Sequence, residues 1–293
     1  MTIQTDVPLS RWTTIGTGGP ASAFAQPRTI AELESDLRWA AEHGLEARAI
    51  GLGSNLLAAD GGVDTLVLRL GGELGEASIE EDVLIAGGGA TNAVCVHRAR
   101  AAGLGGFEFA CAIPGTAGGG VWMNAGAYGS DWAAILVRAL VVTSEGAGWL
   151  TPAELGLTYR HSDLRAGQVV ATVEYRLEPR PVREIRQRVA ELVAQRKATQ
   201  PTNKRTFGSV FKNPDGELGA GRLIELVGLK GHRIGGAVVS PRHANFIENA
   251  GGATSADCLA LIDEARRRVF EEHGIVLEPE VVLLGGISPA PVG

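Results

Sequence analysis

The sequence has little cysteine: three residues among 293, at Cys95, Cys111 and Cys258. An odd number without metal-type spacing argues against a disulfide framework or a zinc site and indicates a reducing compartment. No run approaches the roughly 18 apolar residues of a membrane-spanning helix, and residues 1–12 lack the apolar centre of a signal peptide. We therefore expect a cytoplasmic protein with no metal and no membrane partner.

Long basic runs are also missing, and the net charge is −6, so a nucleic-acid partner is not expected. No internal repeat of solenoid period appears. The content of hydrophobic residues, 45%, predicts a sizeable buried core.

Glycine is in excess: 41 residues, about twice the usual share of roughly 7%. The glycines are clustered and not periodic, which excludes a collagen-like chain or a flexible linker. Clustered glycine in an apolar chain indicates tight turns and close contact between backbone and ligand.

The pattern along the chain predicts an α+β fold with a glycine-rich front portion and a smaller back domain from about residue 180. A capping box at Thr29 and Glu32 starts a helix that ends near Gly44, and Gly103 and Gly274 end two more. Pro179 and Pro181 separate the two portions. The expected helices cover residues 30–43, 90–102, 182–196, 218–227 and 255–273, and the expected strands cover 47–50, 65–70, 83–86, 135–143 and 169–177.

The helix after the prolines has an apolar stripe on one side. Its arginines lie on the other side, which predicts a solvated helix face more readily than a binding patch. These arginines are Arg183, Arg186, Arg188 and Arg196.

Two glycine loops can hold an anion. Residues 51–55 (GLGSN) follow an expected strand and can form a nest of backbone N–H groups. They lack the third glycine of a Rossmann fingerprint and the GK[ST] of a Walker loop, so a plain turn fits equally well. Residues 113–120 (IPGTAGGG) form the second loop, and together the loops fit the diphosphate of FAD. Glycine-mediated packing of a strand on a helix remains the alternative.

Residues 206–214 (TFGSVFKNP) carry a hydroxyl beside a glycine. We expect Phe207 and Phe211 to keep water from Ser209, with a cation at Lys212 and an amide at Asn213 within reach. On composition alone, a strand end in which Ser209 caps the backbone is as plausible.

Taken in order, these motifs resemble the UDP-N-acetylenolpyruvoylglucosamine reductase (MurB) family of peptidoglycan synthesis. The resemblance spans residues 12–285, and the short interval from Arg160 to Ser209 matches the family's shorter type II form. The matching segments are GLGSNLL (51–57), IPGT (113–116), NAGAYG (124–129), YRHS (159–162), GSVFKNP (208–214), LKGHRIGGA (229–237), SPRHANFIEN (240–249) and LEPE (277–280).

The resemblance implies an FAD-binding domain of the PCMH/vanillyl-alcohol-oxidase type in two subdomains, residues 1–65 and 66–179. A C-terminal α+β substrate-binding domain follows at residues 180–293. It implies non-covalent FAD, NADPH as co-substrate and the enolpyruvyl ether of UDP-N-acetylglucosamine as substrate. A monomer is expected.

The resemblance also implies site residues. Arg160 would hold the substrate carboxylate, Ser209 would donate the proton to C2, and Glu280 would act as a neutral acid, while Glu278 is interpreted as surface structure. Val282 stands where the family commonly has a basic residue. Substrate contacts would come from Tyr128, Lys212 and Asn213, and cofactor contacts from Gly51, Leu52, Gly53, Ser54, Asn55, Leu56, Pro114, Gly115, Thr116, Gly118, Gly119, Asn124 and Gly126.

Two other functions remain open on the sequence. One is an FAD-dependent sugar or lactone oxidase of the same fold, for which Cys111 is the nearest candidate for a covalent flavin tether. The other is a non-catalytic protein that binds a nucleotide sugar. The joint presence of Arg160, Ser209 and Glu280 argues against the second.

Overall fold

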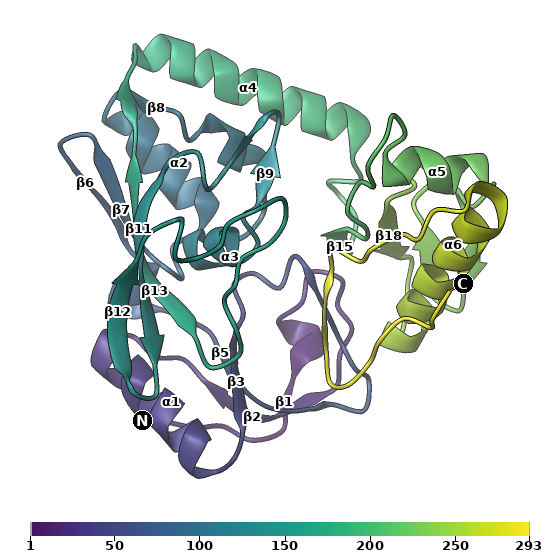
Figure 1. The fold of residues 1–293 in the computed structure, drawn as a ribbon, viewed down its shortest axis with the longest axis horizontal. Helices are drawn as coiled ribbons and strands as arrows, with labels where there is room; N and C mark the ends of the chain where they lie inside the picture. The colour runs from purple at the N-terminus through teal and green to yellow at the C-terminus, as the bar shows by residue number, and fades with distance from the viewer. Residues whose placement is uncertain (1, 293) are drawn as a thin grey trace. The chain divides into compact units, whose positions relative to one another are not determined.

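The computed structural model describes residues 2–292, which divide into two compact units. Within the described residues, the first unit comprises residues 2–5, 23–52 and 64–196, and the second comprises residues 6–22, 53–63 and 197–292. The chain crosses between them within β2 (Pro20–Ala25), β5 (Val63–Leu68) and α4 (Val182–Thr199). Figure 1 shows these elements in chain order.

The first unit is built on a five-stranded antiparallel sheet of order β12-β11-β13-β7-β6. These strands are β6 (Ala77–Glu80), β7 (Val83–Gly87), β11 (Leu136–Thr143), β12 (Gly146–Leu150) and β13 (Val169–Arg176). The other elements of this unit are α1 (Ile30–Glu42), β3 (Glu46–Ala49), η2 (Gly72–Gly75), α2 (Asn92–Ala101), β8 (Leu104–Gly105), η3 (Glu108–Ala112), α3 (Ala117–Trp122), β9 (Gly126–Ala127), β10 (Ser130–Asp131) and β14 (Glu178–Pro179).

The central strand β13 contributes buried side chains to both faces of this sheet, and a bulge changes which of its residues face each core. The register between β11 and β13 shifts at Leu140/Val141, so that Ala171 has no partner in the ladder. An extra residue reverses which face the following side chains occupy. Val169 and Ala171 accordingly join the core beneath α1, whereas Val173 joins the core beneath α2 and α3.

An aromatic cluster fills the core beneath α2 and α3. Trp132 and Tyr175 are fully buried, and the Trp132 indole N–H donates to the Tyr175 hydroxyl at 2.7 Å. Phe107 and Phe109 pack their rings against Trp132 at 5.7 and 5.2 Å. The indole and phenol are thus buried with their polar atoms paired, which fixes this core.

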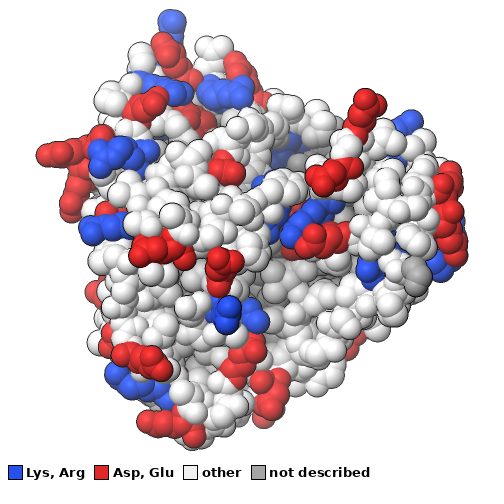
Figure 2. Space-filling view, in the orientation of Figure 1, with Lys and Arg blue, Asp and Glu red and all other residues white. Residues whose placement is uncertain are grey.

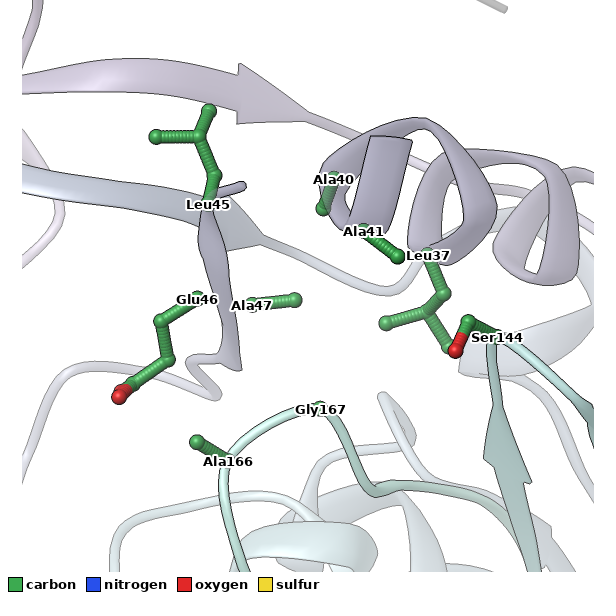
Figure 3. Close-up of a pocket in the computed structure, with 9 residues that line it drawn as sticks. All are labelled: Leu37, Ala40, Ala41, Leu45, Glu46, Ala47, Ser144, Ala166 and Gly167. Atoms are coloured by element: carbon green, nitrogen blue, oxygen red, sulfur yellow. The ribbon is translucent and has the colours of Figure 1, made fainter. Parts of the chain in front are cut away.

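Helix α1 packs on the opposite face of the sheet and begins at the expected N-cap, Thr29. The Thr29 hydroxyl accepts from the Glu32 N–H at 3.1 Å, but the Glu32 carboxylate accepts from the Arg28 N–H, one residue before the position that the expected capping box requires. A cavity of about 180 Å³ lies beside the helix and is lined by Leu37, Ala40, Ala41, Leu45, Glu46, Ala47, Ser144, Ala166 and Gly167 (Figure 3). None of the predicted site residues lines it.

Asp36 is a charged residue on the buried side of α1. It is 3% exposed, and its Oδ1 has no hydrogen-bond partner among the described residues. Burial raises the pKa of its carboxyl to about 6. The folded state therefore holds the proton more tightly than the unfolded state. The contribution of Asp36 to stability is fully present below pH 3.8 and is lost as the pH rises through about 6.

The substitution Asp36→Asn is expected to stabilise the protein more at pH 8 than at pH 4, by roughly 1–3 kcal/mol, because it removes the cost of a buried charge. Urea unfolding at both pH values measures this difference. The exposed Asp64→Asn is the matched control. Equal pH dependence in the two variants would contradict the role given to Asp36.

The second unit is built on a four-stranded antiparallel sheet of order β15-β18-β17-β16, with α5 and α6 packed beside it (Figure 1). A separate parallel pair joins β4 to β19, with Leu56 opposite Val282. The elements are β1 (Val7–Pro8), η1 (Leu9–Arg11), β4 (Leu56–Ala58), β15 (Thr206–Ser209), α5 (Ala220–Leu226), β16 (Arg233–Ile234), β17 (Ala237–Val239), β18 (Phe246–Asn249), α6 (Ser255–His273) and β19 (Val282–Leu284).

The expected helices and long strands are confirmed, with boundaries that differ by at most three residues and agree at both ends for α6. Gly103 and Gly274 follow α2 and α6 with φ of 70° and 67°, as helix-ending glycines do. A capping box at Thr254 and Asp257, which the sequence interpretation missed, starts α6. The short strands and the β4–β19 pair were also missed. The three-part division at residues 65 and 179 stays a prediction.

Among residues 2–292, no helix combines the length and apolar character needed to cross a bilayer. On the face drawn in Figure 2, Lys and Arg side chains are interspersed with Asp and Glu side chains.

Candidate active site

Ser209 and Glu280 lie on adjacent backbone segments of the second unit, joined through Val210. Ser209 pairs with Phe246 at the end of β15. The Val210 N–H donates to the Asn245 carbonyl at 2.9 Å, and the Val210 carbonyl accepts from the Glu280 N–H at 2.8 Å. The structure thus brings two of the three predicted catalytic residues together within one unit, although 71 positions separate them in the sequence.

The two phenylalanines around Ser209 belong to the core of the second unit. Phe207 and Phe211 are fully buried in the core of the second unit, whereas Ser209 is half-buried. The rings therefore anchor this segment in the core, and their shielding of the Ser209 hydroxyl stays a prediction. Gly208 has a φ of 81°, and a Cβ at this position would lie 3.1 Å from the Ser54 carbonyl. Glycine is required here by both the backbone angle and the close approach.

Asn245 fixes the segment that follows Ser209. Its Oδ1 accepts from the Phe211 N–H at 2.9 Å, and its Nδ2 donates to the Phe211 carbonyl at 2.8 Å. Sequence reasoning placed Asn245 in a matching motif and gave it no role. Only the fold shows that one side chain satisfies both backbone groups of Phe211.

Lys212 and Asn213 both have protein partners. The Lys212 ammonium lies 2.6 Å from the Glu278 carboxylate, and its side chain is 20% exposed against 68% for Glu278. Glu278, interpreted as surface structure, is therefore the counter-ion of a predicted substrate-binding cation. The Asn213 Oδ1 accepts from the Ala220 N–H at the start of α5, at 3.0 Å.

The first glycine loop is held closely by its neighbours. A Cβ at Gly53 would lie 2.0 Å from the Trp12 carbonyl, so no side chain fits. The Thr14 N–H and hydroxyl both donate to the Gly53 carbonyl, and the hydroxyl also reaches the Thr206 carbonyl at 2.6 Å. The loop is therefore fixed to the strand that carries Ser209.

The two glycine loops meet in the first unit, where a Cβ at Gly51 would lie 2.7 Å from the Thr116 hydroxyl. The Asn92 N–H donates to the Gly115 carbonyl, and its amide donates to the Ile113 carbonyl at 2.9 Å. The Asn92 Oδ1 is buried without a partner among the described residues.

Part of the second glycine loop packs closely against the neighbouring backbone. A Cβ at Gly118 would meet the Gly88 carbonyl at 2.9 Å, so this glycine serves the strand–helix packing that was the alternative to FAD. Pro114 and Gly119 are exposed, and Gly115 is half-buried with a φ of 157°. These three positions form a backbone surface without long side chains, which fits the close approach of a flavin nucleotide.

Arg160, in the first unit, occupies a two-residue loop closed by two hydrogen bonds between Thr158 and His161. Its φ is 54°, a left-handed angle that is strained for a residue other than glycine. Its guanidinium donates to the Gly126 carbonyl at 2.6 Å and lies over the Tyr159 ring at 4.9 Å. A Cβ at Gly126 would lie 2.7 Å from the Ser130 carbonyl, so the neighbouring backbone requires glycine at the position whose carbonyl Arg160 contacts.

Asn124, predicted to contact the cofactor, uses its amide within the protein. Its Nδ2 donates to the Thr158 carbonyl at 2.8 Å, and its Oδ1 accepts from the Ala133 N–H at 2.9 Å. Asn124 therefore supports the loop that carries Arg160.

Two family models match the chain: an FAD binding domain over residues 21–148 and the UDP-N-acetylenolpyruvoylglucosamine reductase C-terminal domain over residues 200–284. The curated UDP-N-acetylenolpyruvoylglucosamine reductase of Anaeromyxobacter dehalogenans (strain 2CP-C) is 46% identical over 284 residues, covering 97% of this chain and 86% of that protein. The chain belongs to the UDP-N-acetylenolpyruvoylglucosamine reductase family.

Other reductases of this family agree. That of Rubrobacter xylanophilus is 43% identical over 282 residues, covering 96% of this chain and 94% of that protein. The crystal structure of the reductase (MurB) from Thermus caldophilus superposes with a TM-score of 0.85 at 38% identity, covering 97% of this chain and 99% of that one. The resemblance read from the motifs, the α+β fold and the FAD-binding domain are confirmed, and the chain is a short-form, FAD-dependent reductase of this family.

One arginine of α4 differs from the solvated face that was expected. Arg183, Arg186 and Arg188 are exposed, but Arg196 is half-buried. Burial lowers the pKa of its guanidinium, which the nearby Tyr128 phenol partly offsets. The Tyr128 hydroxyl donates to the Leu192 carbonyl of the same helix at 3.4 Å. This reductase therefore places a partly desolvated cation beside a predicted substrate contact, where periodicity alone indicated solvent.

Proposed function

We propose that the protein reduces the enolpyruvyl ether of UDP-N-acetylglucosamine to UDP-N-acetylmuramate, with NADPH as electron donor. The observation that carries the proposal is the backbone connection of Ser209 to Glu280 through Val210, within a domain that matches the family's C-terminal model. Serine and glutamate held on adjacent segments supply two groups that can carry a proton.

The reaction poses a definite chemical problem. Hydride addition to C3 of the enolpyruvyl group leaves negative charge at C2, delocalised into the carboxylate. FAD, when bound, supplies the hydride chemistry between NADPH and this double bond. The protein must then stabilise the charge and deliver a proton to C2.

Arg160 is assigned to the first task. A guanidinium holds a carboxylate through two parallel hydrogen bonds and binds it more strongly as charge develops. The strained backbone at Arg160 and its hydrogen bond to the Gly126 carbonyl support a positioned role for this side chain, because backbone strain clusters at functional sites.

Ser209 is assigned the proton transfer to C2, and Glu280 acts with it as a neutral acid. An ionised carboxylate would repel the developing charge, whereas a protonated one can donate a hydrogen bond to it. Lys212, three residues after Ser209, supplies a positive charge, which the paired Glu278 carboxylate partly neutralises in the absence of substrate.

FAD would be bound without a covalent link, held by backbone groups of residues 51–56 and 113–119. Cys111 is a poor tether, because its thiol donates to the Val189 carbonyl and burial raises its pKa, which disfavours the reactive thiolate. This argues against the oxidase alternative with a cysteinyl flavin. Both NADPH and the UDP-sugar need the same flavin face, so they would bind in turn. A monomer and a cytoplasmic location stay predictions.

The test is an absorbance spectrum of the purified protein, then anaerobic reduction with NADPH and addition of the enolpyruvyl UDP-sugar. We expect a flavin spectrum that bleaches with NADPH and returns with the sugar. Yellow FAD released by acid would show that no covalent link exists. Reoxidation by oxygen alone, with no response to the sugar, would favour an oxidase.

Arg196 is assigned to bind the diphosphate of the substrate. This role is open because Val282 stands where the family commonly has a basic residue. The substitution Arg196→Ala is expected to raise the KM for the UDP-sugar by about 10–100-fold, because a charge-assisted contact contributes about 1.5–3 kcal/mol. Steady-state kinetics at fixed NADPH measures it, with the exposed Arg186→Ala as control. An unchanged KM would leave Arg196 as a structural residue of α4.

A further inference from the structure

We propose that Asn55 is a positioning residue for Glu280, and that the first glycine loop thereby sets the place of the acid. The sequence interpretation gave the Asn55 amide to the flavin. In the structure its Nδ2 donates to the Glu280 carbonyl at 3.0 Å. The Asn55 carbonyl accepts from the Val282 N–H at 3.1 Å, so this one residue holds the chain on both sides of Val281.

The backbone of Glu280 is held from two directions. Its N–H donates to the Val210 carbonyl at 2.8 Å, next to Ser209, and its carbonyl accepts from Asn55. All of these residues lie in the second unit. Without the Asn55 amide, the half-buried Glu280 carbonyl loses a hydrogen-bond donor, which weakens the hold on this segment while its backbone bonds to Val210 and to β4 remain.

The same loop also contacts the serine segment. The Ser54 carbonyl lies 3.1 Å from the position of a Gly208 Cβ, and Thr14 joins the Gly53 carbonyl to the Thr206 carbonyl. Residues 53–55 therefore contact the segments that carry both Ser209 and Glu280. A small displacement of this loop would change the separation of the two proton-carrying groups, and misplacement of about 1 Å can cost about 10²-fold in rate.

The inference rests on the proposed function, because it gives Asn55 a role in that reaction. The variant is Asn55→Ala. We expect FAD content and anaerobic flavin reduction by NADPH to stay within about threefold, and reoxidation by the enolpyruvyl sugar to fall about 10–100-fold. Amide hydrogen exchange in residues 280–284 should become several-fold faster, a readout that does not depend on activity.

Asn249→Ala is the matched control. The Asn249 Nδ2 donates to the Ile15 carbonyl at 3.0 Å, and its Oδ1 accepts from the N–H groups of Gly251 and Ala253. This variant loses more hydrogen bonds than Asn55→Ala, so its melting temperature should fall at least as far. Its rate of flavin reoxidation should nonetheless stay near that of the parent protein.

A double-mutant cycle separates positioning through Glu280 from a separate role. In a Glu280→Gln background, Asn55→Ala is expected to slow reoxidation by less than threefold further, because the group it positions is already lost. A full additional loss, or a loss of FAD affinity equal to the loss of rate, would overturn the proposal in favour of a flavin ligand.

Two results tell apart the failure of this inference and the failure of the proposed function. If the parent protein does not reoxidise with the enolpyruvyl sugar, the proposed function fails. If the parent reoxidises and Asn55→Ala does so at the same rate, only the positioning role fails. If Asn55→Ala does not fold, Asn55→Gln replaces it, since the longer side chain displaces the Glu280 carbonyl, and a drop of about tenfold is expected.

Discussion

Ser209→Ala is expected to leave the reduction of bound flavin by NADPH unchanged and to slow its reoxidation by the enolpyruvyl sugar by about 10²–10⁴-fold. The reason is that only the second half-reaction needs a proton at C2. Stopped-flow absorbance at the flavin band, under anaerobic conditions, measures the two half-reactions separately. In deuterated water, the rate at which solvent deuterium is incorporated at C2 should fall by the same factor.

Two further variants separate proton donation from backbone capping. Ser209→Cys presents a more acidic group at nearly the same place, so it should recover part of the lost rate. Ser22→Ala removes a serine hydroxyl that donates to a backbone carbonyl, Val63 O at 3.1 Å, and should leave both half-reactions intact. If Ser209→Ala slowed both half-reactions equally, the hydroxyl would be structural.

The sequence predicted the elements whose signals are local. Helices α1 and α6 were found because apolar periodicity and a terminal glycine act within a few residues. The parallel pair of β4 and β19 was missed, since Leu56 and Val282 are far apart in the chain and each strand has three residues. The bulge at Ala171 was missed because it depends on how two strands pair.

The site shows the same division. The motifs were enough to name Arg160, Ser209 and Glu280, because the sequence gives the chemical type of each side chain directly. The supporting bonds could not: Asn245 holds backbone groups of Phe211, and Asn55 holds the carbonyl of Glu280. A side-chain bond to a backbone group far away in the sequence has no local sequence signal. The burial of Arg196 could not be predicted either. Helix periodicity shows which side of α4 is apolar, but it does not show which segments cover the end of the helix.

Backbone strain gives independent support to one part of the predicted site. Five described residues other than glycine have a positive φ, and three of them are predicted site residues: Asn124, Tyr128 and Arg160. Such angles cost about 1–2 kcal/mol each, and they persist where the surroundings or a function require them. The hydrogen bonds of Asn124 to Thr158 and of Arg160 to Gly126 show how the first unit imposes the geometry.

Arg160→Lys is the second substitution with a large expected effect. Lysine keeps the positive charge but cannot form two parallel hydrogen bonds to a carboxylate. We therefore expect reoxidation by the enolpyruvyl sugar to fall about 10²–10³-fold, because the variant loses donors aimed at charge that develops in the transition state. Flavin reduction by NADPH should be unaffected, and stopped-flow measurement of both half-reactions tests this.

Arg138→Lys is the control for that substitution. Arg138 donates twice to the Glu174 carboxylate, at 2.8 Å each, and lies over the Trp149 ring at 4.2 Å, so it is also a bidentate, stacked arginine of the first unit. It has no role in the proposed reaction, and its replacement should change neither half-reaction. If Arg160→Lys raised the KM for the sugar while kcat stayed the same, Arg160 would bind the carboxylate equally in the ground state and the transition state. It would then be a substrate ligand and would not stabilise the developing charge.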